Sequence, residues 1–133
     1  MNMIKEDYVS FEIAKLLKEK GFDCGCDMYY TEIGSVKYTQ LKYNHNEIKN
    51  RYSRPTHQMA TKWLREVHDV FIKIDMIQDG MYDIINDFVY KEPIFQYEII
   101  GINGNDAYKL RGGFNLYEEA VEAAIKYCLE NLI

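Results

Sequence analysis

Two cysteines separated by one residue, Cys24 and Cys26, are the first residues whose types and spacing suggest chemistry. Two thiols this close together would suit a redox pair or the beginning of a metal site. A structural zinc site needs three or four ligands, however, and its cysteines are usually two to four residues apart. The third cysteine and the histidines lie scattered along the chain, at Cys128, His45, His57 and His68. The sequence therefore predicts no metal site and no cofactor, and it places Cys24 and Cys26 in a turn between a helix and a strand.

Histidines near predicted helix ends are the next candidates, because a neutral imidazole can act as a general base. His57 lies at the start of a predicted helix, where the helix dipole favours the neutral ring, and His68 lies at its end, where the dipole favours the charged ring. No serine or cysteine nucleophile motif accompanies either histidine. Cys128 lies on the apolar face of another predicted helix, where it acts as a small hydrophobic residue. We therefore expect capping or solvated histidines and a protein that is not an enzyme.

A basic middle third is the strongest functional signal in the sequence. The chain has a net charge of −5, yet residues 37–67 hold seven lysines and arginines against two acids, and both flanks are acidic. Basic side chains interleaved with tyrosines are typical of proteins that bind single-stranded nucleic acid. The same charge separation also favours self-association or contact with a charged protein partner. The candidate contact residues are Lys37, Lys42, Lys49, Arg51, Tyr52, Arg54, Lys62 and Arg65.

Two functions follow from this charge pattern. We expect a small non-enzymatic accessory domain that works by protein–protein contact or self-association. The alternative is a protein that binds single-stranded nucleic acid through residues 37–67. The acidic overall charge disfavours the alternative, because an acidic surface repels a polyanion.

Length and composition indicate a single domain over residues 1–133. Hydrophobic residues make up 47% and charged residues 28% of the chain, which is close to average globular usage. The first residues carry charge rather than an apolar leader, and no segment approaches roughly 18 consecutive apolar residues. The three cysteines cannot all pair within one chain. We therefore expect a cytoplasmic protein with free thiols and no membrane contact.

Local capping signals and apolar spacing predict three helices. The first runs from about residue 10 to residue 20, with Ser10 as its N-cap and Gly21 just beyond its end. The second follows Thr56, and the third runs from Asn115 to about residue 132, with Asn115 and Glu118 resembling a capping box. The expected buried face of the second helix contains Met59, Ala60, Trp63, Leu64 and Val67.

Alternating segments predict hairpins between these helices. Strands are expected near residues 27–32, 36–43, 70–77, 94–102 and 107–111, and residues 44–54 are expected to form a loop. Turns are expected at Asp79 with Gly80 and at Asn103 with Gly104. Residues 81–90 fit either a strand or a helix, and the flanking turns favour a strand. The order α-β-β-α-β-(β)-β-β-α predicts an α+β fold, in which about three helices pack on one face of a mainly antiparallel sheet.

Three predicted helical segments also resemble known sequences. They are residues 8–22, 55–68 and 117–130, which together make up about a third of the chain. In these segments the chain resembles a family of short uncharacterised proteins encoded by gut bacteria and their phages or mobile elements. The resemblance implies a shared fold and a mobile-element setting. It implies no activity, because none is assigned to that family.

Overall fold

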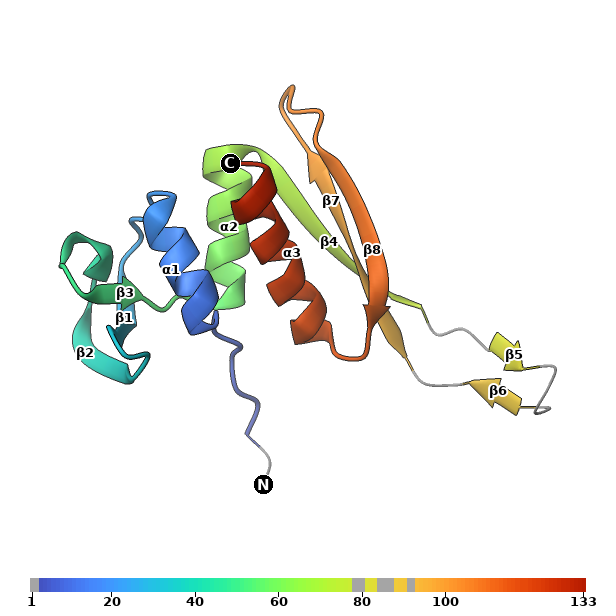
Figure 1. Ribbon diagram of the computed structural model, residues 1–133, viewed down its shortest axis with the longest axis horizontal. Coiled ribbons are helices and arrows are strands. Elements are labelled where there is room, and N and C mark those ends of the chain that lie inside the picture. The colour runs from blue at the N-terminus through green and yellow to red at the C-terminus, as the bar shows by residue number, and fades with distance from the viewer. Residues whose placement is uncertain (1–2, 78–80, 84–87, 91–92) are drawn as a thin grey trace.

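The computed structural model describes residues 3–77, 81–83, 88–90 and 93–133 (Figure 1). The fold is α+β and its elements follow the predicted order. They are α1 (Phe11–Glu19), β1 (Cys26–Thr31), β2 (Val36–Tyr43), the short 3₁₀ helix η1 (His45–Glu47), β3 (Arg51–Ser53), α2 (His57–His68), β4 (Val70–Ile77), β5 (Met81–Asp83), β6 (Phe88–Tyr90), β7 (Ile94–Gly101), β8 (Tyr108–Phe114) and α3 (Tyr117–Asn131).

The strands form separate antiparallel sheets rather than one. The first sheet has the order β2-β1-β3, the second has the order β4-β7-β8, and β5 pairs with β6. Strand β3 lies inside the segment that the sequence predicts to be a loop. A strand of three residues is too short to show alternation, and it is held by pairing with β1. Strand is confirmed within residues 81–90, but as two short strands, β5 and β6, that pair with each other rather than as one strand. Residues 84–87 and the predicted turn at 79–80 lie outside the described residues.

The first two helices begin where their caps predict. The Ser10 hydroxyl accepts a hydrogen bond from the backbone N–H of Ile13 at 3.2 Å, and the Thr56 hydroxyl accepts one from Met59 at 3.1 Å. Gly21 follows α1 with a φ of 91°, a left-handed conformation that favours glycine. The turn residues Asn103 and Gly104 likewise have positive φ, as predicted.

Two details of the predicted helices are wrong. Helix α3 begins after Leu116, which makes no side-chain cap hydrogen bond, so Asn115 and Glu118 do not form a capping box. Val67 is 58% exposed rather than buried. The next residue, His68, packs beside the core instead, with its ring centroid 4.6 Å from that of Trp63.

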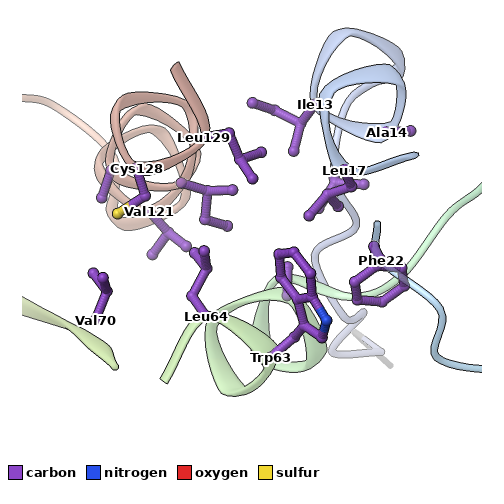
Figure 2. Packing of buried hydrophobic residues seen from close by; sticks show 14 of the residues in the cluster. Ile13, Ala14, Leu17, Phe22, Trp63, Leu64, Val70, Val121, Cys128 and Leu129 are labelled. Carbon is purple, nitrogen blue, oxygen red and sulfur yellow. The ribbon is translucent and has the colours of Figure 1, made fainter. Parts of the chain in front are cut away.

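One cluster of buried side chains joins the three helices to both three-stranded sheets (Figure 2). The helices lie between the two sheets, with the first sheet beside α1 and the second beside α2 and α3 (Figure 1). The ring of Phe22 meets that of Trp63 edge-on, with 5.4 Å between centroids. The helical members of the cluster are Ile13, Ala14, Leu17, Ala60, Trp63, Leu64, Val121, Ala124, Ile125, Cys128 and Leu129.

Candidate functional site

The two arginines of the basic segment that lie in or beside β3 are on opposite faces of the first sheet. The Arg51 guanidinium lies 4.4 Å from the ring centroid of Tyr29, and that of Arg54 lies 5.4 Å from the ring of Tyr30. Tyr29 and Tyr30 are consecutive residues of β1, and consecutive residues of a strand point to opposite faces of a sheet. Arg51 and Arg54 therefore do not line a common groove.

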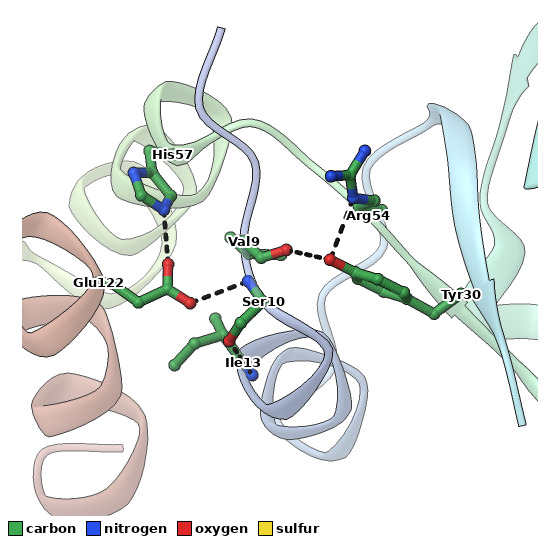
Figure 3. Close-up of polar contacts among 7 residues, drawn as sticks. All are labelled: Val9, Ser10, Ile13, Tyr30, Arg54, His57 and Glu122. Carbon is green, nitrogen blue, oxygen red and sulfur yellow. Dashed lines mark hydrogen bonds and ion pairs between the residues drawn. The ribbon is translucent and has the colours of Figure 1, made fainter. Parts of the chain in front are cut away.

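Arg54 connects the first sheet to the segment before α1. Its Nε donates a hydrogen bond to the Tyr30 hydroxyl at 3.0 Å, and that hydroxyl donates to the carbonyl of Val9 at 2.6 Å (Figure 3). The guanidinium also lies 4.4 Å from the ring of Tyr8. These contacts give Arg54 a structural role, because they fix the entry of the chain into α1.

Lys42 and Lys62 line the same groove, and acidic residues line it as well. Both lysines line a groove of about 570 Å³, which Glu6, Asp23 and Glu66 also line. The Nζ of Lys62 is 3.9 Å from a carboxylate oxygen of Glu66. The groove is therefore mixed in charge and does not offer a continuous basic surface.

The remaining candidate contact residues are spread over other parts of the molecule. Lys37 is exposed on β2, Lys49 is exposed in the loop before β3, and Arg65 is half-buried on α2. The Tyr52 ring is half-buried and packs against Phe11, with 5.6 Å between ring centroids. The structure thus separates the basic segment into several small groups of side chains.

Glu122 of α3 joins the N-terminal ends of the other two helices (Figure 3). One carboxylate oxygen lies 2.5 Å from Nε2 of His57, and the other accepts a hydrogen bond from the backbone N–H of Ser10 at 2.8 Å. The side chains of His57 and Glu122 are 12% and 26% exposed. His57 is therefore neither a cap nor a solvated residue. The sequence missed this pair because its partners are 65 residues apart.

The environment of Glu122 favours its carboxylate form. Burial alone would raise the pKa of this carboxyl group, but the hydrogen bonds from His57 and Ser10 outweigh burial and lower the pKa below its ordinary value. A carboxylate in this position requires a proton on Nε2 of His57. A carboxylate that orients an imidazole is also found in hydrolases, where the imidazole activates a nucleophile.

Within the described residues, no free serine or cysteine lies beside His57. The imidazole shares a groove of about 510 Å³ with Ser10, but the Ser10 hydroxyl accepts a hydrogen bond from Ile13 as the cap of α1. The imidazole also lines a groove of about 420 Å³ whose apolar residues include Ile72, Ile74 and Val121, and no described serine or cysteine lines it. Its two threonine hydroxyls are occupied within α2: Thr56 caps the helix, and Thr61 donates to the Gln58 carbonyl at 3.0 Å. The pair of His57 and Glu122 is therefore best explained as a connection between helices.

The other two histidines are packing residues. His45 is fully buried, its Nε2 lies 3.0 Å from the carbonyl oxygen of Cys26, and its ring centroid is 4.6 Å from that of Tyr29. Within the described residues, His45 Nδ1 and His68 Nε2 are buried without a hydrogen-bond partner. Burial lowers the pKa of both imidazoles, although Asp69 opposes this effect at His68. Both rings are accordingly neutral near pH 7.

The cysteines are free thiols in settings that keep them protonated. Burial raises the pKa of Cys26 and that of Cys128 to about 12, and it also raises the pKa of the half-buried Cys24. A thiol with a raised pKa is a poor nucleophile near neutral pH. Over residues 3–77 and the other described segments, no three His, Cys, Asp or Glu side chains gather as a metal site.

The outer face of the second sheet is an open and partly apolar surface. Helices α2 and α3 pack on one face of β4, β7 and β8, while the other face is uncovered (Figure 1). Odd-numbered residues of β4 point outward, which agrees with the alternation in the sequence. The alternation alone does not show which face the helices leave open. The exposed apolar residues of this outer face are Phe71, Ile77, Ile94, Tyr108 and Leu110.

Polar side chains on the same face are paired with one another. Lys73 Nζ is 3.7 Å from a carboxylate oxygen of Asp75, and the Tyr108 hydroxyl donates to Glu98 at 2.9 Å. These contacts hold the polar groups beside the apolar ones. The outer face therefore combines exposed apolar residues with polar side chains that contact one another.

Comparisons with known proteins do not assign this site. No family model matches the chain, and searches of curated proteins and of solved structures find no match. In the described part of the chain, no helix has the length and apolar character needed to cross a membrane.

Proposed function

We propose that this protein is a non-enzymatic interaction domain that binds a protein partner through the outer face of β4, β7 and β8. The observation that carries the proposal is the helix-free face of this sheet, on which Phe71, Tyr108 and Leu110 are 37%, 60% and 49% exposed. Exposed apolar patches rimmed by polar residues are typical of contact surfaces. Tyrosine is particularly suited to such surfaces, since its ring combines a large contact area with a polar end.

The pairing of polar groups on this face supports the proposal. Side chains that are fixed before binding lose less conformational entropy when a partner arrives. The Tyr108–Glu98 hydrogen bond and the Lys73–Asp75 ion pair bring four polar side chains together in this way before a partner arrives. The outer face is therefore better prepared for a specific partner than a surface of free, flexible side chains.

The chemistry of the remaining residues also favours a non-enzymatic role. The thiols of Cys26 and Cys128 are buried with raised pKa values, and the two grooves beside His57 offer no free serine, threonine or cysteine among their described residues. The placement of Arg51 and Arg54 on opposite faces of the first sheet disfavours nucleic acid as the partner. A protein partner fits both observations.

Site-specific photo-crosslinking in the native host tests the proposal. Tyr108→p-benzoylphenylalanine should give a discrete adduct with a second protein, because the probe would lie within the contact surface. Phe71→Ser added to this variant should reduce the adduct yield, since it removes an apolar contact on the same face. Leu41→p-benzoylphenylalanine is the matched control, because Leu41 is 80% exposed on β2, away from the second sheet.

Mass spectrometry of the adducts then separates the possible outcomes. A protein adduct specific to position 108 and sensitive to Phe71→Ser supports the proposal. Equal protein adducts from positions 41 and 108, or an adduct with nucleic acid instead, would contradict it.

A further inference from the structure

The free edge of β4 carries an inference that goes beyond the proposed outer-face contact. Strand β4 pairs with β7 at all eight residues from Val70 to Ile77, without a bulge. It is an edge strand of the second sheet, as β8 is on the other side. Natural edge strands are commonly protected by proline, bulges or charged side chains. Strand β4 has no proline and no bulge, and its two charged residues, Lys73 and Asp75, are opposite in sign and lie 3.7 Å apart.

Hydrogen bonding at the start of β4 determines which backbone groups face its open edge. The backbone N–H of Ile102 donates to the carbonyl of Asp69 at 2.9 Å, directly before β4. Hydrogen-bonded pairs alternate along an antiparallel ladder, so every second residue after Asp69 faces β7. The N–H and C=O groups of Ile72, Ile74 and Met76 consequently point away from β7. No hydrogen bond found for the described residues uses them.

We propose that two copies of this chain form a dimer by antiparallel pairing of their β4 strands about a twofold axis at Ile74. This register places Ile74 opposite Ile74 of the second copy and Ile72 opposite Met76 of the second copy. Each outward-facing backbone group then meets an outward-facing group, as an antiparallel ladder requires. The result is one continuous six-stranded sheet, which is made of the β4-β7-β8 sheets of the two copies.

Charge selects this register over its neighbours. On the outer face, β4 presents Phe71, Lys73, Asp75 and Ile77 in this order, and an antiparallel copy presents the same residues in the reverse order. An axis at Ile74 places each Lys73 opposite Asp75 of the second copy. An axis at Lys73 would place two lysines together, and an axis at Asp75 would place two aspartates together. Directly opposite unlike charges stabilise strand pairing, whereas like charges destabilise it.

Apolar burial favours the same arrangement on the inner face. Ile72, Ile74 and Met76 form the inner row of β4, and Met76 is 54% exposed. Ile72 and Ile74 line the groove of about 420 Å³ beside α2 and α3. In the proposed dimer Met76 of the second copy would lie opposite Ile72, at the border of this groove. The pairing therefore removes apolar area of both copies from water.

Charge variants at two positions provide the test, with sedimentation measured from micromolar to millimolar concentrations. Wild-type protein should show a monomer–dimer equilibrium. Lys73→Asp should weaken dimerisation by roughly tenfold or more, because two attractive pairs become repulsive. Asp75→Lys should weaken it similarly. An equimolar mixture of the two single variants should dimerise again, since the two aspartates on β4 of one variant would then face the two lysines on β4 of the other.

The mixture keeps the test independent of folding, because misfolded variants would not recover dimerisation when combined. Ile74→Pro should also abolish the dimer, since it removes an N–H that faces the open edge, a position at which edge strands tolerate proline. Leu110→Ser on β8 should leave the dimer unchanged, although it would weaken the proposed outer-face contact. A wild-type protein that stays monomeric, or a mixture that does, would overturn the inference.

Discussion

At the scale of single residues, the carboxylate of Glu122 acts as a junction between the three helices. It belongs to α3, and it accepts hydrogen bonds from His57 in the first turn of α2 and from Ser10, the N-cap of α1. Both oxygens are thus used by different helices. Loss of either partner would leave a partly buried charge with fewer hydrogen bonds, which is unfavourable because water does not fully replace them.

His57→Ala should therefore destabilise the fold. We expect the free energy of unfolding to fall by about 1–3 kcal/mol, the usual cost of leaving a buried polar group without its hydrogen-bond partner. The lower part of this range is favoured because water screens side chains that are 12% and 26% exposed. Urea denaturation of His57→Ala, Glu122→Gln and the double variant would measure the coupling between the two residues.

Lys62→Ala is the matched control for this measurement. Lys62 and Glu66 also form an ion pair, but their side chains are 56% and 60% exposed. Removing such a pair should change the free energy of unfolding by less than about 0.5 kcal/mol. Independent effects of His57→Ala and Glu122→Gln, without coupling, would show that the pair does not connect the helices energetically.

The buried imidazole of His45 makes stability dependent on pH. Its pKa is lowered by burial in the folded state, whereas an unfolded histidine titrates near about 6.5. Below that pH, His45 binds a proton in the unfolded chain but not in the folded chain. The free energy of unfolding should therefore fall as the pH decreases through this region. Glu122 has a lowered pKa and loses its contribution only below the ordinary glutamate range.

His45→Gln should reduce this pH dependence. A glutamine keeps a donor for the Cys26 carbonyl but cannot titrate, so the fall in unfolding free energy between about pH 7 and pH 5.5 should become shallower. His68 would account for the remaining slope, since its pKa is lowered as well. Urea denaturation at several pH values would measure both slopes. Identical slopes for the wild type and His45→Gln would refute this assignment.

At the scale of elements, the β7–β8 hairpin is joined to the end of α2 through its loop. The Asn103 amide donates to the Asp69 carboxylate at 2.8 Å, and the backbone N–H of Gly101 donates to the carbonyl of Ala107 at 2.7 Å. A Cβ atom at position 101 would lie 2.2 Å from the backbone oxygen of Asn105. The loop therefore folds tightly over Gly101, and only glycine fits there.

Gly101→Ala should destabilise the hairpin by about 1–3 kcal/mol, the usual cost of forcing extra volume into a packed site. The contacting atoms belong to the backbone, so they cannot move aside as a flexible side chain would. Gly112→Ala on β8 is the control, because its Cβ would meet the Cβ of Gln96 at an ordinary 3.4 Å. Thermal unfolding of the two variants should show a clear loss only for Gly101→Ala; equal losses would contradict the close approach.

Elements with local signals could be predicted from the sequence, whereas their long-range contacts could not. Ser10 and Thr56 cap their helices as expected, because a cap depends on residues only three positions away. Strand β3 was missed because its signal lies in pairing with β1, whose residues are 20 or more positions away along the chain. The pair of His57 and Glu122 was missed for the same reason.

The candidate surface was only partly accessible to sequence reasoning. Alternation along 70–77 correctly separates Phe71, Lys73, Asp75 and Ile77 from the row of β4 that faces the helices. Alternation does not show which row the helices cover, since both rows contain apolar residues. The division of the strands into two sheets, which leaves one face of the second sheet open, depends on how the helices pack between the sheets.

At the scale of the whole molecule, the fold disperses the positive charge that the sequence concentrates. Residues 37–67 contribute to the first sheet, the loop after it and α2, so their basic side chains point in different directions. Arg51 and Arg54 lie on opposite faces, and Lys42 and Lys62 share their groove with acids. A polyanion that follows one path along the surface would therefore meet only some of these charges, and it would also meet the repulsion of a chain with net charge −5.

Weak binding to single-stranded DNA is the expected consequence. Fluorescence anisotropy with a labelled oligonucleotide at physiological salt should show no affinity beyond the non-specific range of roughly 10⁻⁴–10⁻⁶ M.

Replacing Arg51, Arg54 and Arg65 together by Ser should lower the melting temperature, because Arg54 loses its hydrogen bond to Tyr30. Lys37→Ser with Lys49→Ser is the matched control, since both lysines are exposed and should leave the melting temperature unchanged. If the wild type bound with micromolar or tighter affinity at physiological salt, and this stably folded lysine variant lost that binding, nucleic acid would replace protein as the favoured partner. The reason is that exposed side chains that do not support the fold would then account for the affinity.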